Sequence, residues 1–536
     1  MKQIRELDKS QLTTEQKLGL LLCANLQHGD ADLENALEMI KKHSLGSVWV
    51  SHAHAKRDEI IAKVKEAADY PILIMCDAEQ GYAPYNIPGV IALTAAGAKE
   101  EYALSFGRLN ATVIASEGYN VICSPVLDGR CSNAPCGGTT RHFGPDREIT
   151  ARLGAAMARG MHEGGVLAVA KHYPSSQRSK PYDSHMREGF DEDTREELIE
   201  KALYPYRKLI EKELIDGVMV GHHVLKNIDP DRPASLSRPV LDILRKECGF
   251  QGFYITDALN MMGVVLKYGN HITTPMAVGA GCDIPLSWGI PCKEAYKALL
   301  DGYRDGMITD EQLALSVDRV LTAQHKVTLL PKNTEILPED VENIQRVNRE
   351  CISAVCAEGY TPTIDPEGRH LFVIMTDGTV ALDDSEYDAF SGKSYDPVHI
   401  AKTIRSLFPH SGVLTHPDHP NYEQNMTLFK KQQEYDDIVY ITYYAAMCFI
   451  GRECLTPRTV DMMDALQSTD RIIAHLHFGN PFVATDAPFV PRVLLGWLNK
   501  GCIDHTLRIL AGKEECLGTQ PYADYLRFHK KGDVIC

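Results

Sequence analysis

Histidines, lysines and carboxylates are concentrated in one stretch, KHYPSSQRSKPYDSHM, which covers residues 171–186. Lys171 and His172 follow the apolar run VLAVA, and Asp183 and His185 close the polar loop. An imidazole can give up a proton and take one back near neutral pH, and a neighbouring carboxylate can fix its tautomer and stabilise its charged form. The D-x-H spacing lets the two side chains meet on a loop, whereas a helix would turn them apart. The stretch therefore predicts an acid/base pair, Asp183 and His185, after a buried strand.

Other apolar runs in the first 300 residues also end in residues that could do chemistry. These are Asp77, Glu79, Asp128, His222, His223, Asp257 and Asp283, with Arg141 in the Gly-rich loop GGTTRHFGPD. Each has a structural explanation when taken alone, because an aspartate often caps the next helix and a single histidine is usually a hydrogen-bonded core residue. Burying so many ionisable groups in one place is costly, and together they predict a functional site.

Two chemistries could use this set of residues. One is metal-assisted hydrolysis, because an HxH pair places two imidazoles on one side of a strand, as zinc sites do. Its ligands would be His52, His54, Lys171, His222 and Asp283. The other is glycoside hydrolysis, which needs a carboxylate nucleophile and a separate proton donor. The residues alone leave both chemistries open.

The elements that must position these residues alternate between strands and helices. The runs LGSVWVSHAH, YPILIMCDAEQG, YNVICSPVLDG, VLAVAKHYP, DGVMVGHHV, QGFYITDAL and AGCDIPL are typical of strands buried on both faces. Helical segments are predicted over 149–165, 194–214 and 238–249. A first helix is predicted within LTTEQKLGLLL, where Thr13 and Gln16 can form a capping box.

This alternation predicts an α/β chain with an N-terminal (β/α)8 TIM-type barrel over residues 1–330. A doubly wound open sheet is the alternative, but the polar strand ends converge on one mouth only if the sheet closes. The proline-containing stretch 331–340 is predicted to be a linker. The runs HLFVIMTD, DIVYITYYAA, RIIAHLHFGNPF and RVLLGWLN predict a smaller open, sandwich-like α/β domain over 341–536.

The composition is that of a soluble globular protein, with 44% apolar and 24% charged residues among 536 and a net charge of −16. This charge argues against nucleic-acid and membrane partners, which need clustered cations. We expect neither a Sec-type signal peptide nor a membrane span. Fifteen cysteines occur without CxxC pairs, and Cys131 and Cys136 are expected to be free thiols. The chain is thus predicted to be cytoplasmic and to bind a small molecule, with a homodimer possible.

The order of the motifs resembles glycoside hydrolase family 3, most closely its NagZ-like β-N-acetylglucosaminidase (β-N-acetylhexosaminidase) branch. LTTEQKLGLLL is similar to the first-helix motif, IMCDAEQG to the D-x-E-G segment, and SPVLD with RHFGPD to the following loop. KHYP and DSH resemble the Lys-His and Asp-Ser-His signatures. VMVGHHV, DPDRPASLS, GFQGFYITDALNM and AGCDIPL follow in the same order, and HFGNPF resembles part of the second domain of longer members.

The resemblance implies a retaining glycoside hydrolase that needs no metal or other cofactor. It would release β-linked N-acetylglucosamine, or a related β-glycosyl residue, from small soluble glycosides through a covalent glycosyl-enzyme. Asp257 would be the nucleophile, His185 the general acid and base, and Asp183 the partner of His185. The sugar would be bound by Asp77, Arg141, Lys171, His172 and His222.

The chain departs from the pattern of this branch at three places. SSQRSK replaces Gly-His-Gly, Ala258 stands where a second aspartate is usual, and Tyr82 and Tyr85 replace basic residues. The tyrosines argue against an acidic neighbour such as the lactyl group of N-acetylmuramic acid. Three alternatives stay open: a zinc-dependent amidohydrolase, a family 3 phosphorylase, whose neutral imidazole would let phosphate approach, and a non-catalytic sugar-binding homologue.

Overall fold

The structure is a computed structural model, and it describes residues 4–26, 30–81, 89–129, 138–175, 183–332, 335–376, 395–444, 454–487 and 490–528. The chain forms two compact units. The first comprises Met1–Tyr82, Ala103–Arg130 and Asp146–Val341, and the second comprises Ala83–Tyr102, Cys131–Pro145 and Glu342–Cys536. The predicted domain boundaries at residues 330 and 341 stay a prediction. The second unit differs from the predicted C-terminal domain, because it also includes Ala83–Tyr102 and Cys131–Pro145.

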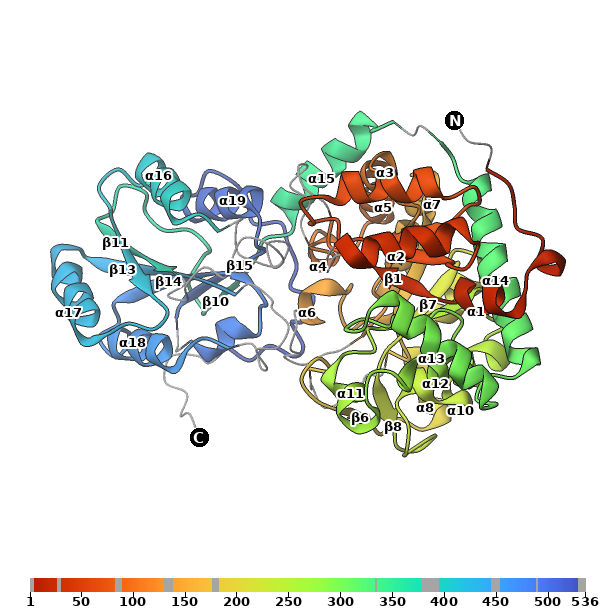
Figure 1. The fold of residues 1–536 in the computed structure, drawn as a ribbon. Helices are drawn as coiled ribbons and strands as arrows, with labels where there is room; N and C mark the ends of the chain where they lie inside the picture. The colour runs from red at the N-terminus through yellow and green to blue at the C-terminus, as the bar shows by residue number, and fades with distance from the viewer. Residues whose placement is uncertain are drawn as a thin grey trace. The chain divides into compact units, whose positions relative to one another are not determined.

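The first unit is built on parallel strands that neighbour one another in chain order (Figure 1). They are β1 (Cys23–Asn25), β2 (Ser47–Trp49), β3 (Leu73–Cys76), β4 (Val121–Ile122), β5 (Leu167–Tyr173), β7 (Gly217–Val220) and β9 (Phe253–Thr256). An eighth extended segment continues the series, because Ile284 bridges Ile255 in parallel. The rings of Trp49, which ends β2, and Trp288, which follows the eighth segment, lie 5.3 Å apart between centroids. This ring contact shows that the sheet curls round so that its eighth segment approaches β2, and the predicted barrel is confirmed.

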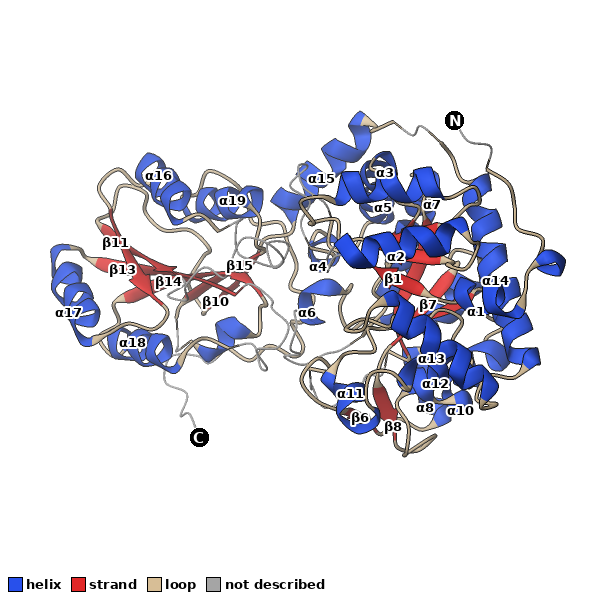
Figure 2. Cartoon of the chain, viewed as in Figure 1, coloured by secondary structure: helices blue, strands red, loops and turns tan. Residues whose placement is uncertain are grey.

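Helices follow the strands, and most of them cover the outside of this sheet (Figure 2). They are α1 (Thr14–Leu20), α2 (Asp30–Lys41), α3 (Arg57–Ala67), α5 (Glu100–Ser116), α7 (Arg147–Glu163), α8 (Arg195–Glu197), α9 (Tyr204–Glu211), α10 (Arg238–Asp242), α11 (Met262–Tyr268), α12 (Thr273–Ala280), α13 (Cys292–Arg304) and α14 (Asp310–Leu329). The predicted capping box of Thr13 and Gln16 starts α1. No helix within the described ranges combines the length and apolar character of a membrane span.

Two short strands outside the barrel sheet tie together the loops that follow β5 and β7. They are β6 (Gly189–Asp191) and β8 (His223–Leu225), which pair in parallel with Gly189 opposite His223. Gly189 has no room for a side chain, because a Cβ atom there would lie 2.6 Å from the imidazole of His223. The loop that carries Asp183 and His185 is therefore anchored at its C-terminal end, where the chain enters β6.

The second unit contains an open six-stranded sheet in the order β10-β15-β14-β13-β11-β12, in which only the β10–β15 pair is antiparallel. Its strands are β10 (Ser353–Cys356), β11 (His370–Thr376), β12 (Gly412–Pro417), β13 (Asp437–Tyr444), β14 (Ile472–Gly479) and β15 (Arg492–Gly496). Its helices are α4 (Ile91–Ala95), α6 (Gly138–Arg141), α16 (Pro397–Leu407), α17 (Tyr422–Lys431), α18 (Pro457–Gln467) and α19 (Lys500–Leu510), and α15 (Pro338–Glu350) begins in the first unit. The predicted smaller open α/β domain is confirmed.

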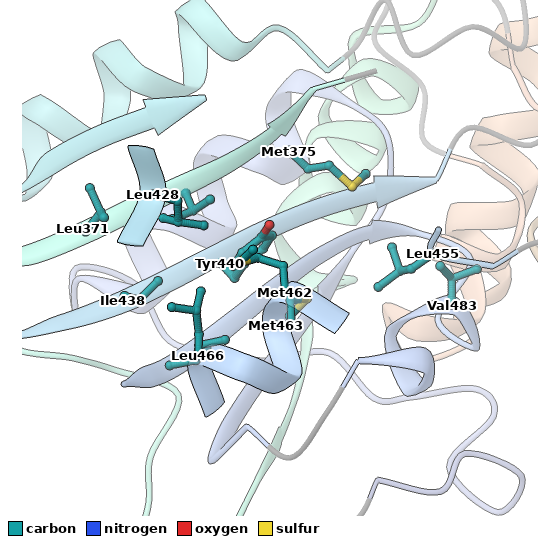
Figure 3. Packing of buried hydrophobic residues seen from close by; sticks show 12 residues of the cluster. Leu371, Met375, Leu428, Ile438, Tyr440, Leu455, Met462, Met463, Leu466 and Val483 are labelled. Atoms are coloured by element: carbon teal, nitrogen blue, oxygen red, sulfur yellow. The ribbon is translucent and has the colours of Figure 1, made fainter. Parts of the chain in front are cut away.

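The core of the second unit lies between the central strands and two helices on one face of the sheet. Leu371, Ile438 and Tyr440 of the strands pack with buried side chains of α17 and α18, such as Leu428 and Met463 (Figure 3). The helices α16 and α19 cover the opposite face (Figure 2). This layered packing explains the continuous apolar runs in these strands, because both faces are covered.

Two fully buried histidines of β14 form a hydrogen-bonded chain with a threonine of β13. His475 Nε2 lies 2.7 Å from Thr442 Oγ1, which lies 2.8 Å from His477 Nδ1. His477 Nε2 donates in turn to the carbonyl of Asn480 at 3.0 Å. Burial lowers the pKa of His475 to about 3, and burial likewise lowers the pKa of His477 to about 4. Both imidazoles are therefore neutral in the folded unit at neutral pH.

This histidine pair is expected to make the second unit sensitive to acid. An unfolded histidine binds a proton below about pH 6.5, whereas these buried imidazoles stay neutral until about pH 4 or lower, so stability falls with pH across that window. Each histidine should cost about 2 kcal/mol of unfolding free energy between pH 6.5 and 5. Hydrogen exchange of the β14 peptide in the intact chain measures this loss. Equal opening free energies at the two pH values would contradict it.

Candidate active site

The predicted site residues of the first unit lie at the carboxyl ends of the barrel strands, with one exception described below. Asp77 directly follows β3, and Asp257 directly follows β9. Lys171 and His172 come immediately before Tyr173, the last residue of β5. His222 lies two residues beyond the end of β7. In a barrel these ends meet at one mouth, where catalytic residues gather.

Asp257 is held in a cluster of histidines. Its Oδ1 atom accepts a hydrogen bond from the N–H of Ala258 at 2.8 Å. Burial by itself raises the pKa of Asp257, but the electrostatic influence of the nearby His172, His222 and His185 and the hydrogen bond from the Ala258 N–H outweigh burial, so that the pKa lies below its ordinary value. Asp257 is therefore an ionised carboxylate at neutral pH, as a nucleophile must be.

Asp183 and His185 form the predicted pair. Asp183 Oδ1 lies 2.8 Å from His185 Nδ1 and also accepts the backbone N–H of His185 at 2.9 Å. The Asp183 side chain is 2% exposed, whereas the His185 side chain is 26% exposed. Because the carboxylate accepts at Nδ1, the Nε2 atom of His185 is the one that can exchange protons with a bound molecule.

Backbone hydrogen bonds fasten this loop to the helix that follows Asp257. The Met262 N–H donates to the carbonyl of His185 at 3.2 Å, and the Gly263 N–H donates to the carbonyl of Ser184 at 3.0 Å. A Cβ atom on Gly263 would lie 3.0 Å from that Ser184 oxygen, so glycine permits the close approach. The loop after β5 and the loop after β9 thus form one assembly that holds His185 beside Asp257.

An irregularity in β5 explains how two consecutive residues both serve the mouth. The strand pairs regularly with β7 as far as Ala170, and the register shifts before Tyr173, so that Lys171 and His172 together oppose one residue. Side chains of neighbouring residues in a regular strand point to opposite faces, and a bulge re-aims one of them. His172 Nδ1 bonds to Asp128 Oδ2 at 2.9 Å, and the His172 N–H donates to Asp128 Oδ1 at 3.2 Å.

Lys171 is the centre of a second cluster. Its side chain is 1% exposed, and the ammonium group forms ion pairs with Asp77 Oδ1, at 2.6 Å, and with Glu79. Asp77 is 42% exposed, whereas Glu79 is buried. Glu79 therefore balances the buried charge, and Asp77 presents a carboxylate to the mouth. His52 lies close enough to feel the charges of all three groups, although burial is the main cause that lowers its pKa.

His222 was predicted to bind the substrate, and that role stays a prediction. The structure gives its imidazole two protein partners. His222 Nε2 bonds to the carbonyl of Ala258 at 3.0 Å, and Nδ1 bonds to Ser235 Oγ at 2.8 Å. The residue is 1% exposed, and burial lowers the pKa of the imidazole. His222 therefore fixes the backbone next to Asp257.

Comparisons with known proteins show the family to which the chain belongs. The model of the glycosyl hydrolase family 3 N-terminal domain matches residues 13–323. A "Beta-hexosaminidase" of Idiomarina loihiensis is 30% identical over 282 residues, which are 51% of this chain and 82% of that protein. Another of Tolumonas auensis is 28% identical over 326 residues, 59% of this chain and 96% of that protein.

The chain belongs to glycosyl hydrolase family 3. Like the β-hexosaminidases that it matches, it is a glycoside hydrolase. A solved family 3 β-N-acetylglucosaminidase from Paenibacillus has the same fold over 95% of this chain and 98% of its own, with a TM-score of 0.79 and 24% identity. A solved β-glucoside phosphorylase shares the fold over 96% of this chain and 94% of its own, with a TM-score of 0.80 and 21% identity.

Asp283 is the exception among the residues predicted at the mouth, and this prediction was wrong. The Asp283 side chain is fully buried near the beginning of β9, where Oδ2 accepts from the Tyr254 N–H and from Arg245, both at 2.8 Å. Its Oδ1 accepts from Ser316 at 2.7 Å and from Arg319 at 3.0 Å. Asp283 comes directly before Ile284, the residue of the eighth segment that bridges Ile255. It therefore lies at the amino end of that segment. The zinc hypothesis loses two of its expected ligands, because His222 and Asp283 are both bound to protein groups at separate places.

The structure leaves some predicted residues without a test. Arg141 ends α6 in the second compact unit, and its role in binding the sugar stays a prediction. Tyr82, Tyr85, most of the SSQRSK loop, Cys131 and Cys136 lie outside the described residues. Glu79 and Asp128 were expected at the mouth without a role, and the structure shows that they hold Lys171 and His172.

Proposed function

We propose that this family 3 enzyme hydrolyses β-linked N-acetylglucosaminides with retention of configuration, through a covalent intermediate on Asp257. The support for the sugar is the name of the two bacterial relatives, which are β-hexosaminidases. The support for the mechanism is one observation. The loop with the Asp183–His185 pair is hydrogen-bonded to the first turn of the helix that follows Asp257, so that a carboxylate and an imidazole share one wall of the mouth.

In the first step, Asp257 attacks the anomeric carbon while His185 Nε2 gives its proton to the leaving oxygen. The bond between the anomeric carbon and that oxygen breaks, and an ester forms on Asp257. In the second step, His185 takes a proton from a water molecule that attacks the same carbon and releases the Asp257 carboxylate. Asp183 stabilises the imidazolium before the first step and after the second. Two displacements restore the β configuration.

Sugar binding is assigned to the groups around Lys171. Asp77 is half-exposed beside the Lys171 ammonium and can accept hydrogen bonds from sugar hydroxyls. His172, whose ring is oriented by Asp128, lies close enough to Asp257 to lower the pKa of that carboxyl group. These groups would hold the ring so that its anomeric carbon faces Asp257.

The role of the Asp183–His185 pair can be tested with Asp183→Asn. We expect kcat/KM for an alkyl β-N-acetylglucosaminide to fall roughly 10²- to 10⁴-fold, because the imidazolium loses its counter-charge and its fixed tautomer. A 2,4-dinitrophenyl glycoside needs no proton on its leaving group, so its kcat/KM should change much less. Steady-state kinetics with both substrates measure the difference.

A matched control is Asp242→Asn, which changes the same atoms in the Asp242–Lys246 pair on a helix of the barrel. It should leave both values of kcat/KM near those of the unmodified enzyme. An equal loss with both leaving groups in Asp183→Asn would show that the pair does not protonate the leaving group. Formation of a glycosyl phosphate when phosphate is added would assign phosphate, in place of water, as the acceptor.

A further inference from the structure

Three exposed apolar side chains lie next to the proposed acid/base residue. Met186 directly follows His185 and is 44% exposed, and Met262 and Leu266 of α11 are 41% and 73% exposed. A single exposed apolar residue needs no explanation, but a group of them beside a site marks a surface that binds something.

The backbone places these three residues side by side. The hydrogen bond from the Met262 N–H to the His185 carbonyl, 3.2 Å long, brings the start of α11 against the peptide that leads into Met186. Met262 and Leu266 are four residues apart in the helix and therefore lie on the same face. We call Met186, Met262 and Leu266 the α11 patch.

The polar residues of α11 are used elsewhere. Lys267 Nζ and Tyr268 Oη both donate to the carbonyl of Asp231, at 2.8 and 2.7 Å. Gly263 and Val264 are buried against the unit. The helix is thus held by its other sides. Met262 and Leu266 leave an exposed apolar face beside Lys267, against the usual pattern of a surface helix.

We propose that the α11 patch is the binding surface for the leaving group of the substrate, and that this leaving group is an alkyl or aryl moiety. The inference rests on the proposed function. If His185 protonates the leaving oxygen, the group attached to that oxygen must pass along the loop of His185, and Met186 is the next residue of that loop. Methionine and leucine offer it flexible apolar contacts and no hydrogen-bond donors.

The test compares methyl and octyl β-N-acetylglucosaminides, whose leaving groups are alcohols of similar acidity, with the octyl compound below its micelle concentration. We expect kcat/KM to be at least roughly tenfold higher for the octyl glycoside, because burying a few methylene groups accounts for such a factor. Leu266→Gln should bring this ratio down to roughly twofold. Leucine and glutamine have similar helix propensities, so the helix is retained.

Leu329→Gln is the matched control, because Leu329 ends α14 and is 69% exposed. It should keep the octyl preference of the unmodified enzyme. A ratio within twofold in the unmodified enzyme, or a ratio that Leu266→Gln leaves unchanged, would overturn this inference while the glycosidase activity stands. A change of oligomeric state in Leu266→Gln at constant ratio would assign the patch to a second copy of the chain. If neither glycoside nor an aryl β-N-acetylglucosaminide is cleaved, the proposed function itself fails.

Discussion

Asp257→Ala is expected to lower kcat by a factor on the order of 10⁴ or more, the largest effect of any single substitution in this enzyme. The alanine has no atom that could form the ester, and the charge that faces the imidazoles of His172, His185 and His222 is removed as well. Steady-state kinetics with an aryl β-N-acetylglucosaminide measure the loss.

Added azide should restore part of the activity of Asp257→Ala, because a small anion can enter the space of the carboxylate and attack the anomeric carbon. The product would be a glycosyl azide of inverted configuration. This rescue separates the loss of a nucleophile from misfolding, which azide cannot repair. Activity of Asp257→Ala within tenfold of that of the unmodified enzyme, without azide, would contradict the role of Asp257.

Asp283→Asn is expected to have the largest effect on stability. The carboxylate accepts four hydrogen bonds, two of them from Arg245 and Arg319, whose side chains are only 12% and 22% exposed. Asparagine keeps the shape but leaves two largely buried guanidinium groups without a counter-charge. Breaking such a pair costs about 3–5 kcal/mol. Urea unfolding of the intact chain measures the change.

Asp318→Asn provides the control for Asp283→Asn, because Asp318 lies on the same helix, α14, as Ser316 and Arg319. Asp318 is 55% exposed and pairs with Lys9 at 2.6 Å. An exposed pair of this kind contributes at most about 1 kcal/mol. A loss below about 1 kcal/mol in Asp283→Asn would show that the buried network does not need the charge.

The fold could be predicted from the sequence because buried parallel strands leave a strong signal. Apolar runs correctly marked β2, β3, β4, β5, β7 and β9. Two other strands, β1 and β12, left no such signal. β1 has three residues and adjoins the apolar end of the first helix, and β12 at the edge of its sheet is only partly buried. The predicted helix over 194–214 is divided into α8, a π-helical turn and α9.

The members of the candidate site could be predicted, but several of their roles could not. Polar residues after apolar runs identified Asp77, Asp257 and the Asp183–His185 pair, because strand ends and a two-residue spacing are local features. The role of His222 depends on a carbonyl 36 residues away, and that of Asp283 on an arginine 38 residues away. Such contacts are set by the closure of the barrel and have no local pattern.

The central claim is that Asp257 forms the covalent bond to the sugar, and one measurement tests it most directly. A 5-fluoro-N-acetylglucosaminyl fluoride keeps the acetamido group, and its second fluorine slows both steps while the good leaving group keeps the first one fast. Mass spectrometry of the digested, inactivated enzyme should find the sugar on the peptide that contains Asp257. A sugar on any other residue of the inactivated enzyme would contradict the account.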